Sequence, residues 1–221
     1  MYRFPDKRTL ENILLLISAA FGLAHAWLGR SSMNPDGVSY LDMGDALVRR
    51  EWTHAVNAYW SPLYGWMLGL VVGTIRPSPR WEFPLVHVVN FSIFLVALVC
   101  FRFFLHEVIR FSHERAQLDE AKSDGRVALP DWALLLLDYS IFLWASLELV
   151  GLYDVSPDQA VLACVCLQAG LLLRLRRSPT PRNFALLGLV LGGGYWTKVI
   201  LFPLGFLILF FVYLWKRPSR I

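Results

Sequence analysis

Long apolar runs, separated by short polar or basic segments, constrain this chain more than any other feature of its sequence. A transmembrane helix needs about 20 predominantly apolar residues. Six runs approach that length: residues 10–28, 83–105, 132–153, 159–173, 184–195 and 199–214. Only 17% of the residues are charged, against about 25% in soluble domains. We therefore predict an all-α, polytopic membrane protein, with residues 1–221 forming a single membrane domain of six spans.

The basic residues lie beside the apolar runs. Three groups stand out: Arg3, Lys7 and Arg8; Arg174, Arg176 and Arg177; and Lys216, Arg217 and Arg220. Clusters of this kind flank transmembrane helices on the cytoplasmic side. We therefore expect both termini in the cytoplasm, and the net charge of +4 does not indicate nucleic acid as a partner. Residues 10–28 are too long for a signal peptide and are interpreted as a retained first span.

This orientation places residues 30–82 outside the cell membrane only if the short run at residues 62–75 does not cross it. At about 1.5 Å per residue that run covers roughly 21 Å, against a hydrocarbon core of about 30 Å. We predict that residues 37–50 and 62–75 form two helices at the membrane surface. The polar residues 106–130 are predicted to be a cytoplasmic loop.

The first outer loop is rich in acids, with Asp36, Asp42 and Asp45 close together. Asp36 follows a turn and suits the N-cap of a helix. A carboxylate at the membrane surface also suits a general base or a metal ligand, because partial desolvation raises its proton affinity. Asp42 and Asp45 fall on one polar helix face with Arg49, so we expect a solvated face with Asp45 paired to Arg49.

Two further residues are expected on the same side of the membrane. Asp158 follows Ser156 and Pro157 and also suits an N-cap. If Asp36 and Asp158 meet, their oxygens are candidate ligands for a divalent metal ion, and no other cofactor is indicated. Lys198 stands between two apolar runs. It either snorkels to the surface or neutralises a phosphate group.

Polar residues also occur within and beside the spans. Asp138 and Glu148 lie in the third predicted span, where a charge is costly unless it is paired or faces protein. They are either structural or line a substrate path. His54 and His87 are interpreted as hydrogen-bonded histidines near the outer face.

Four short motifs together resemble a known family. The motifs are Pro35-Asp36-Gly37 with Tyr40 and Asp42; Trp60-Ser61-Pro62-Leu63-Tyr64; Ser156-Pro157-Asp158; and Tyr195-Trp196-Thr197-Lys198 after a glycine-rich helix. Their order and spacing resemble the GT-C superfamily of membrane glycosyltransferases, in particular its protein O-mannosyltransferase-like and lipid-A aminoarabinose transferase-like branch. The resemblance covers residues 10–215.

The resemblance implies an inverting transferase that moves a sugar from a polyprenyl-phosphate carrier to an acceptor on the outer face. Asp36 then matches the catalytic base, and Asp158 matches the second acid near the metal or the carrier phosphate. Lys198, Tyr40 and Tyr64 are candidates for binding substrate or carrier phosphate. Members of the superfamily normally continue for more spans. The resemblance therefore extends to an N-terminal membrane module, with a second chain as a candidate source of the missing spans.

Two other functions are compatible with the sequence. The first is a non-catalytic membrane subunit or lipid-binding scaffold derived from the same fold. The second is a transporter component, which would need a polar path through the spans; Asp138 and Glu148 are the only hints of such a path. Membrane lipids are expected partners in every case.

Overall fold

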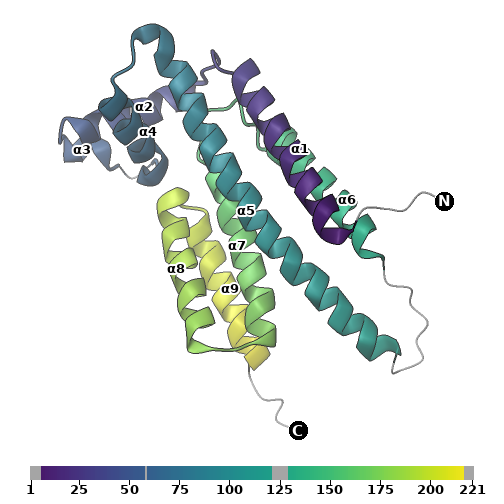
Figure 1. The fold of residues 1–221 in the computed structure, drawn as a ribbon. Coiled ribbons are helices and arrows are strands. Elements are labelled where there is room, and N and C mark those ends of the chain that lie inside the picture. Colours follow the sequence, from purple (N-terminus) through teal and green to yellow (C-terminus); the bar gives the residue numbers. More distant parts are fainter. Residues whose placement is uncertain (1–5, 58, 121–128, 217–221) are drawn as a thin grey trace.

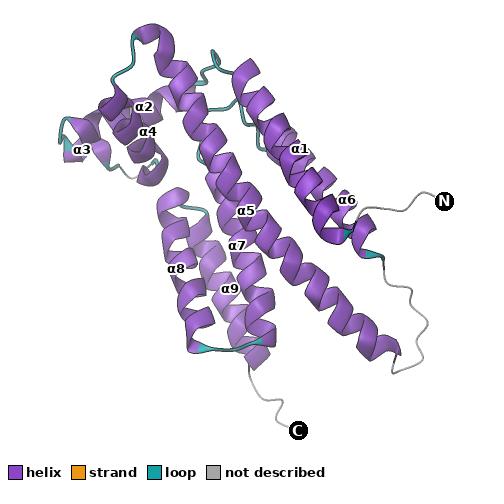
Figure 2. Ribbon diagram, viewed as in Figure 1, coloured by secondary structure: helices purple, strands orange, loops and turns teal. Residues whose placement is uncertain are grey.

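The computed structural model of this chain describes residues 6–57, 59–120 and 129–216. Within these residues all regular structure is helical, as Figure 2 shows. The elements in chain order are α1 (Lys7–Leu28), α2 (Pro35–Val48), α3 (Trp52–Ala55), α4 (Pro62–Ile75), α5 (Pro79–Glu120), α6 (Asp131–Trp144), the π-helical turn η1 (Ala145–Leu149), α7 (Asp158–Arg177), α8 (Pro181–Thr197) and α9 (Leu201–Lys216).

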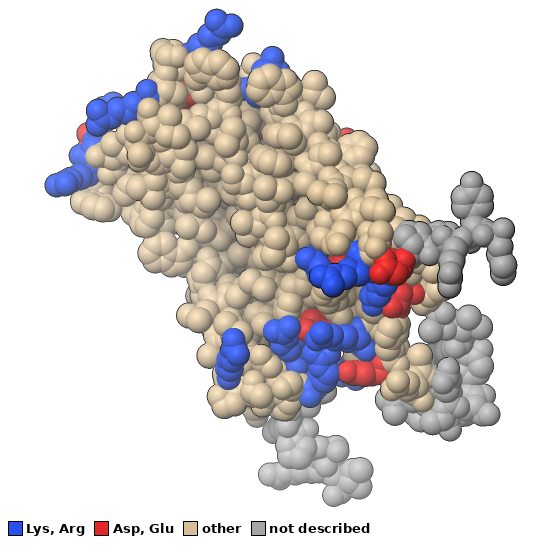
Figure 3. Space-filling view, viewed as in Figure 1, with Lys and Arg blue, Asp and Glu red and all other residues tan. Residues whose placement is uncertain are grey.

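Four segments are long and apolar enough to cross a membrane: Lys7–Leu28, Pro79–Gln117, Asp131–Leu149 and Asp158–Arg177. Figure 3 shows a broad face almost free of charged residues between the two charged ends of the molecule. The chain is therefore a helical membrane protein, as the apolar runs predict. Helices α8 and α9 are shorter, with 17 and 16 residues, so the count of six spans stays a prediction.

The prediction of a loop from residue 106 onward is wrong for the described residues up to 120. Helix α5 runs unbroken for 42 residues and does not end near Leu105. Its extension is stabilised by ion pairs with a neighbouring helix, because Glu107 lies between Arg174 and Arg177 of α7. Residues 121–128 of the predicted loop lie outside the described residues.

The third predicted span is divided. Helix α6 passes into η1 and ends at Leu149, before the predicted end at residue 153. Gly151 then adopts a φ of +75°, a left-handed conformation that glycine takes without steric cost. This turn leads the chain into α7 and places residues 154–158 at the end of the bundle where α1 ends and α5 begins, which is called the outer end after its predicted orientation.

Helices α2, α3 and α4 gather at one end of the long α5 helix (Figure 1). The predicted surface helices 37–50 and 62–75 are observed as Pro35–Val48 and Pro62–Ile75. Glycines allow α2 and α4 to cross in close contact, since a Cβ atom on Gly44 would lie 2.7 Å from the Cα atom of Gly69. Small residues permit such approach of helix backbones. Helix α4 therefore packs against α2 at this end of the bundle.

The main core lies between α1, α5, α6 and α7. Buried side chains such as Phe94, Phe101, Leu135 and Phe142 form its centre. The rings of Phe101 and Phe142 stack with centroids 4.5 Å apart. This core holds the long helices together and sets the distance between the turns at their outer ends.

Candidate functional site

The four motif segments meet at the outer end of the bundle. Ser61 at the start of α4 donates a hydrogen bond from Oγ to the carbonyl oxygen of Tyr195 at 3.4 Å. The rings of Trp66 and Trp196 touch edge to face, with centroids 5.5 Å apart. These contacts join α4 to the end of α8, next to Lys198. Segments from two distant parts of the sequence therefore share one surface.

Asp158 and Lys198 form an ion pair at the centre of this surface. The Nζ atom of Lys198 lies 2.5 Å from Oδ1 of Asp158. Their side chains are 37% and 42% exposed respectively. The Oγ atom of Ser156 donates to the other carboxylate oxygen, Oδ2, at 3.2 Å. The ammonium group is thus held in place without being removed from solvent, so an anion can still reach it.

Neither predicted N-cap is observed. Helix α2 begins at Pro35, with Asn34 as its N-cap, and α7 begins at Asp158 itself, after Pro157. Proline suits the first helical position because its missing N–H needs no partner there. The carboxylates of Asp36 and Asp158 therefore lie in the first turns of their helices, where the helix dipole favours negative charge.

Asn34 joins the two acid-bearing segments. Its Oδ1 atom accepts a hydrogen bond from the backbone N–H of Val155 at 2.9 Å. Because Asn34 lies two residues before Asp36, and Val155 three residues before Asp158, this one bond couples the start of α2 to the start of α7.

Tyr40 links Asp36 to Asp158 electrostatically. Burial raises the pKa of the Tyr40 phenol, and the negative charges of Asp158 and Asp36 raise this pKa further. Both carboxylates are therefore within electrostatic range of its phenol. The ring is only 2% exposed and packs on Trp60 and Tyr64. Tyr40 forms the buried floor of the site, and Asp36, one helical turn earlier in α2, is exposed.

The structure gives Tyr64 a different role from the predicted one. Its side chain is 1% exposed, and burial raises the pKa of its phenol. The hydroxyl group donates to Oδ1 of Asn90 at 2.5 Å, and Nδ2 of Asn90 donates to the carbonyl oxygen of Asp154 at 3.1 Å. Tyr64 thus supports the turn before Asp158 from below and does not face a ligand.

Sequence reasoning gave no role of their own to four polar residues of this end: Asn34, Asn90, Asp154 and Ser156. Burial and the charge of Asp158 raise the pKa of Asp154, so a further carboxyl group lies beside the ion pair. The sequence could have indicated Asn90, because an isolated asparagine in an apolar span usually needs a buried hydrogen-bond partner. The others occur in turns, where polar residues are common for local reasons.

The donor set does not fit a resident divalent metal ion. The ammonium group of Lys198 already occupies Oδ1 of Asp158, which leaves few oxygens for the six or more ligands that such ions prefer. Among the described residues, no group of three or more His, Cys, Asp or Glu side chains is arranged to hold a metal. Lys198 places a positive charge where the metal was expected.

The remaining predictions concern the surroundings. Asp45 pairs with Arg49 at 2.7 Å, and both are largely exposed, which confirms the solvated face. His87 hydrogen-bonds through Nε2 to the carbonyl oxygen of Ser32 at 3.0 Å, as predicted for an interfacial histidine. Glu148 lies 3.9 Å from Nε2 of His25 and is 65% exposed.

No protein-family model matches this chain, and the comparisons with curated proteins and with solved structures find no significant match. The functional argument therefore rests on the geometry of the outer end and on the chemistry of its residues.

Proposed function

We propose that this protein is a membrane glycosyltransferase, or the N-terminal part of one, that uses a polyprenyl-phosphate sugar as donor. The observation that carries the proposal is the convergence of the starts of α2 and α7 with the end of α8. Asp158 holds the ammonium group of Lys198, and the hydrogen bond from Val155 to Asn34 holds the start of α2, which carries Asp36, against the segment that leads into α7. Transfer of a sugar from a lipid phosphate requires a base and a cation on the same accessible surface at the membrane. The outer end offers both.

The proposed orientation places this surface outside the cytoplasm. The opposite end of the bundle carries most of the basic residues next to the spans: Lys7, Arg8, Arg102, Arg110, Arg174, Arg176, Arg177 and Arg182. Basic flanks favour the cytoplasmic side. The first turn of α1 and the last turn of α9 lie in this half of the molecule in Figure 1, which supports the proposed cytoplasmic termini.

Asp36 is proposed to accept the proton of the acceptor hydroxyl. The acceptor oxygen then forms a bond to the anomeric carbon of the sugar, while the bond between that carbon and the carrier phosphate oxygen breaks. The bonding electrons leave with the phosphate. A base positioned within hydrogen-bond reach of the hydroxyl contributes about 10²–10⁴-fold to such a reaction.

Lys198 is proposed to stabilise the departing phosphate. Charge develops on the phosphate oxygen as its bond to the sugar breaks, and a fixed cation is most effective where charge develops. Asp158 positions the ammonium group, and the Lys198 side chain, at 42% exposure, keeps a free side toward solvent. The raised pKa of Tyr40 keeps its phenol neutral, so no third negative charge forms on the floor of the site.

Substitution of the proposed base tests the assignment. Membranes containing Asp36→Asn are incubated with polyprenyl-phosphate donors carrying labelled hexose or pentose, and transfer to endogenous acceptors is measured. We expect a loss of at least about 100-fold with unchanged protein level. Asp45→Asn is the matched control, because Asp45 lies on the same helix and pairs only with the exposed Arg49.

Each outcome is informative. Activity retained in Asp36→Asn would refute the base assignment, and equal losses in both variants would show a general effect of charge on α2. Absence of transfer by the unaltered protein across the donor panel would favour a non-catalytic lipid-binding scaffold instead.

A further inference from the structure

An apolar groove opens on the opposite side of the loop that leads into α2. It lies between the outer half of α1, the α4–α5 turn and the start of α5, and its volume is about 250 Å³. Its lining includes Leu23, Trp27, Arg30, Trp81, Val88 and Phe91. Pockets that enclose a whole small ligand measure roughly 300–1,000 Å³. This groove therefore suits part of an elongated molecule.

The lining changes character along the groove. Leu23, Val88 and Phe91 are purely apolar, whereas Trp27 and Trp81 lie nearer the outer ends of their segments. Tryptophan is enriched at the level of lipid headgroups, and both rings are more than half exposed. The groove thus runs from the hydrocarbon region to the membrane surface.

Arg30 lies at the headgroup end of this groove. Its guanidinium group rests on the ring of Trp27, 4.4 Å from the centroid, and Nη1 donates to the carbonyl oxygen of Trp27 at 2.7 Å. Within the described part of the chain, no carboxylate lies within ion-pair distance of it, in contrast to Arg49, Arg102 and Arg174. An immobilised arginine with free donors is well suited to bind a phosphate group.

We infer that this groove binds one anionic phospholipid, with an acyl chain along Leu23, Val88 and Phe91 and the headgroup phosphate on Arg30. An apolar channel that ends at a fixed, uncompensated cation is complementary to a lipid of this charge. A partner helix is a poorer fit, because the groove is narrow and ends in a charge. The choice of leaflet rests on the proposed orientation, but the binding itself does not depend on sugar transfer.

A bound lipid would contact the connection between α1 and α2, which leads to Asp36 in the first turn of α2. His87 lines the groove, is 1% exposed, and holds the carbonyl oxygen of Ser32 through Nε2. Arg30 and Ser32 both lie in the segment between α1 and α2. A bound lipid therefore contacts the connection that positions the start of α2.

Lipid retention by the purified full-length chain tests the inference. The protein is exchanged into mixed micelles containing equal amounts of phosphatidylglycerol and phosphatidylcholine with identical chains, and bound lipid is counted by native mass spectrometry. We expect one phosphatidylglycerol to be retained several-fold more often than phosphatidylcholine. Arg30→Gln should bring this preference close to one, whereas Arg80→Gln, an exposed arginine that does not line the groove, should leave it unchanged.

A second pair of variants tests the chain-binding part. Val88→Trp fills the groove from an exposed position, so retention of both lipids should fall several-fold. Val96→Trp lies on the same helix, is similarly exposed at 56% against 58%, and should retain lipid as the unaltered protein does. The inference is overturned if Arg30→Gln and Arg80→Gln lose the preference equally, or if Val88→Trp retains lipid normally. Because no sugar donor is present, neither result depends on the proposed transferase activity.

Discussion

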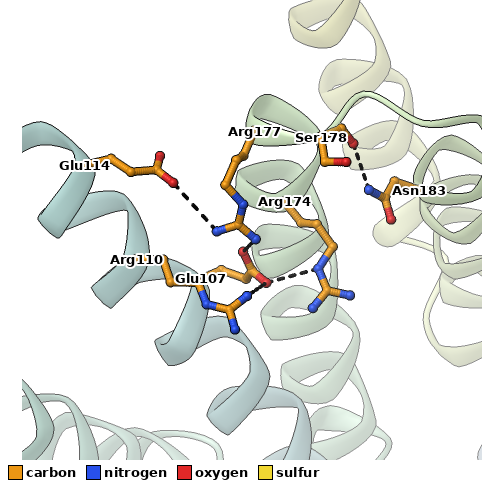
Figure 4. A network of polar contacts seen from close by, with 7 residues as sticks. All are labelled: Glu107, Arg110, Glu114, Arg174, Arg177, Ser178 and Asn183. Atoms are coloured by element: carbon orange, nitrogen blue, oxygen red, sulfur yellow. Dashed lines mark hydrogen bonds and ion pairs between the residues drawn. The ribbon is translucent and has the colours of Figure 1, made fainter.

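Acid–base pairs occur at both ends of the bundle, but their surroundings differ. At the basic end, Glu107 is 1% exposed and contacts Arg110, Arg174 and Arg177 (Figure 4). Glu11 is 6% exposed and accepts from both Arg102 and His106 at 2.7 Å. At the outer end, Asp158 and Lys198 remain more than a third exposed. The buried acids are therefore fully used by structural partners, whereas the outer pair can exchange its partner for a ligand.

The difference shows that an ion pair alone does not identify a functional site. Removing one member of a buried pair leaves an uncompensated charge, so such pairs bear mainly on folding. An exposed pair contributes little to stability, typically about 0–1 kcal/mol. Its substitution should therefore affect ligand chemistry more than the fold. Four predictions test this contrast.

The largest effect is expected for Glu107→Gln. The loss of this carboxylate leaves Arg174 and Arg177 without their buried partner, and breaking such a pair costs about 3–5 kcal/mol. Thermal denaturation in detergent should show a marked decrease in stability. Glu114→Gln is the control, since Glu114 lies 3.9 Å from Arg177 and is half exposed; a similar loss in the control would show that burial is not the deciding factor.

Lys198→Met should separate activity from stability. Loss of a group that stabilises developing charge costs about 10²–10³-fold in rate, and we expect sugar transfer to fall by about 100-fold. The melting temperature should change little, because the pair with Asp158 is partly exposed. Lys198→Arg, which keeps the positive charge, should retain more activity than Lys198→Met. Equal activity of Lys198→Met and the unaltered protein would exclude the phosphate role.

Close helix packing, rather than buried charge, is expected to hold the outer end together. Gly44→Ala places a methyl group 2.7 Å from the oxygen of Gly65 and the Cα atom of Gly69, and such overpacking costs about 1–3 kcal/mol. Gly193→Ala meets nothing within 4 Å and should be neutral or slightly stabilising in a helix. Protease resistance of the α2–α4 segment measures the difference. Equal resistance of the two variants would argue against the close crossing.

The smallest effect is expected for Asp45→Asn. The Asp45–Arg49 pair spans one helical turn, and both side chains are more than half exposed. Pairs of this kind contribute about 0.3–0.5 kcal/mol. Denaturation at low and high salt should give nearly the same stability for the variant and the unaltered protein. A large loss would indicate that this face is covered by an unidentified partner.

Predictions from the sequence were confirmed where a structural feature is determined by neighbouring residues or by composition. The helices predicted at 37–50 and 62–75 lie within two residues of Pro35–Val48 and Pro62–Ile75, because proline and apolar run length mark their bounds. The Asp45–Arg49 pair followed from helical spacing alone. The predicted loop after residue 105 failed for the opposite reason. Polar composition suggested a loop, while ion pairs with α7 keep residues 106–120 of α5 helical.

The candidate site shows the same division. Span parity placed Asp36, Asp158 and Lys198 on one side of the membrane, but the ion pair of Asp158 with Lys198 at 2.5 Å depends on how α7 packs against α8. The supporting role of Tyr64 depends equally on Asn90 of the long α5 helix. In neither contact can the partner residue be identified from the local sequence.

The sequence by itself determined that this chain forms apolar helices in a membrane and that an acidic segment follows the first of them. Helical hydrogen bonds join residues four positions apart, so composition and spacing are sufficient to predict the helices. Only the tertiary structure decided which charged groups are consumed in buried pairs and which remain accessible. That distinction depends on contacts between helices far apart in the sequence, where burial sets the cost of leaving a charge without a partner.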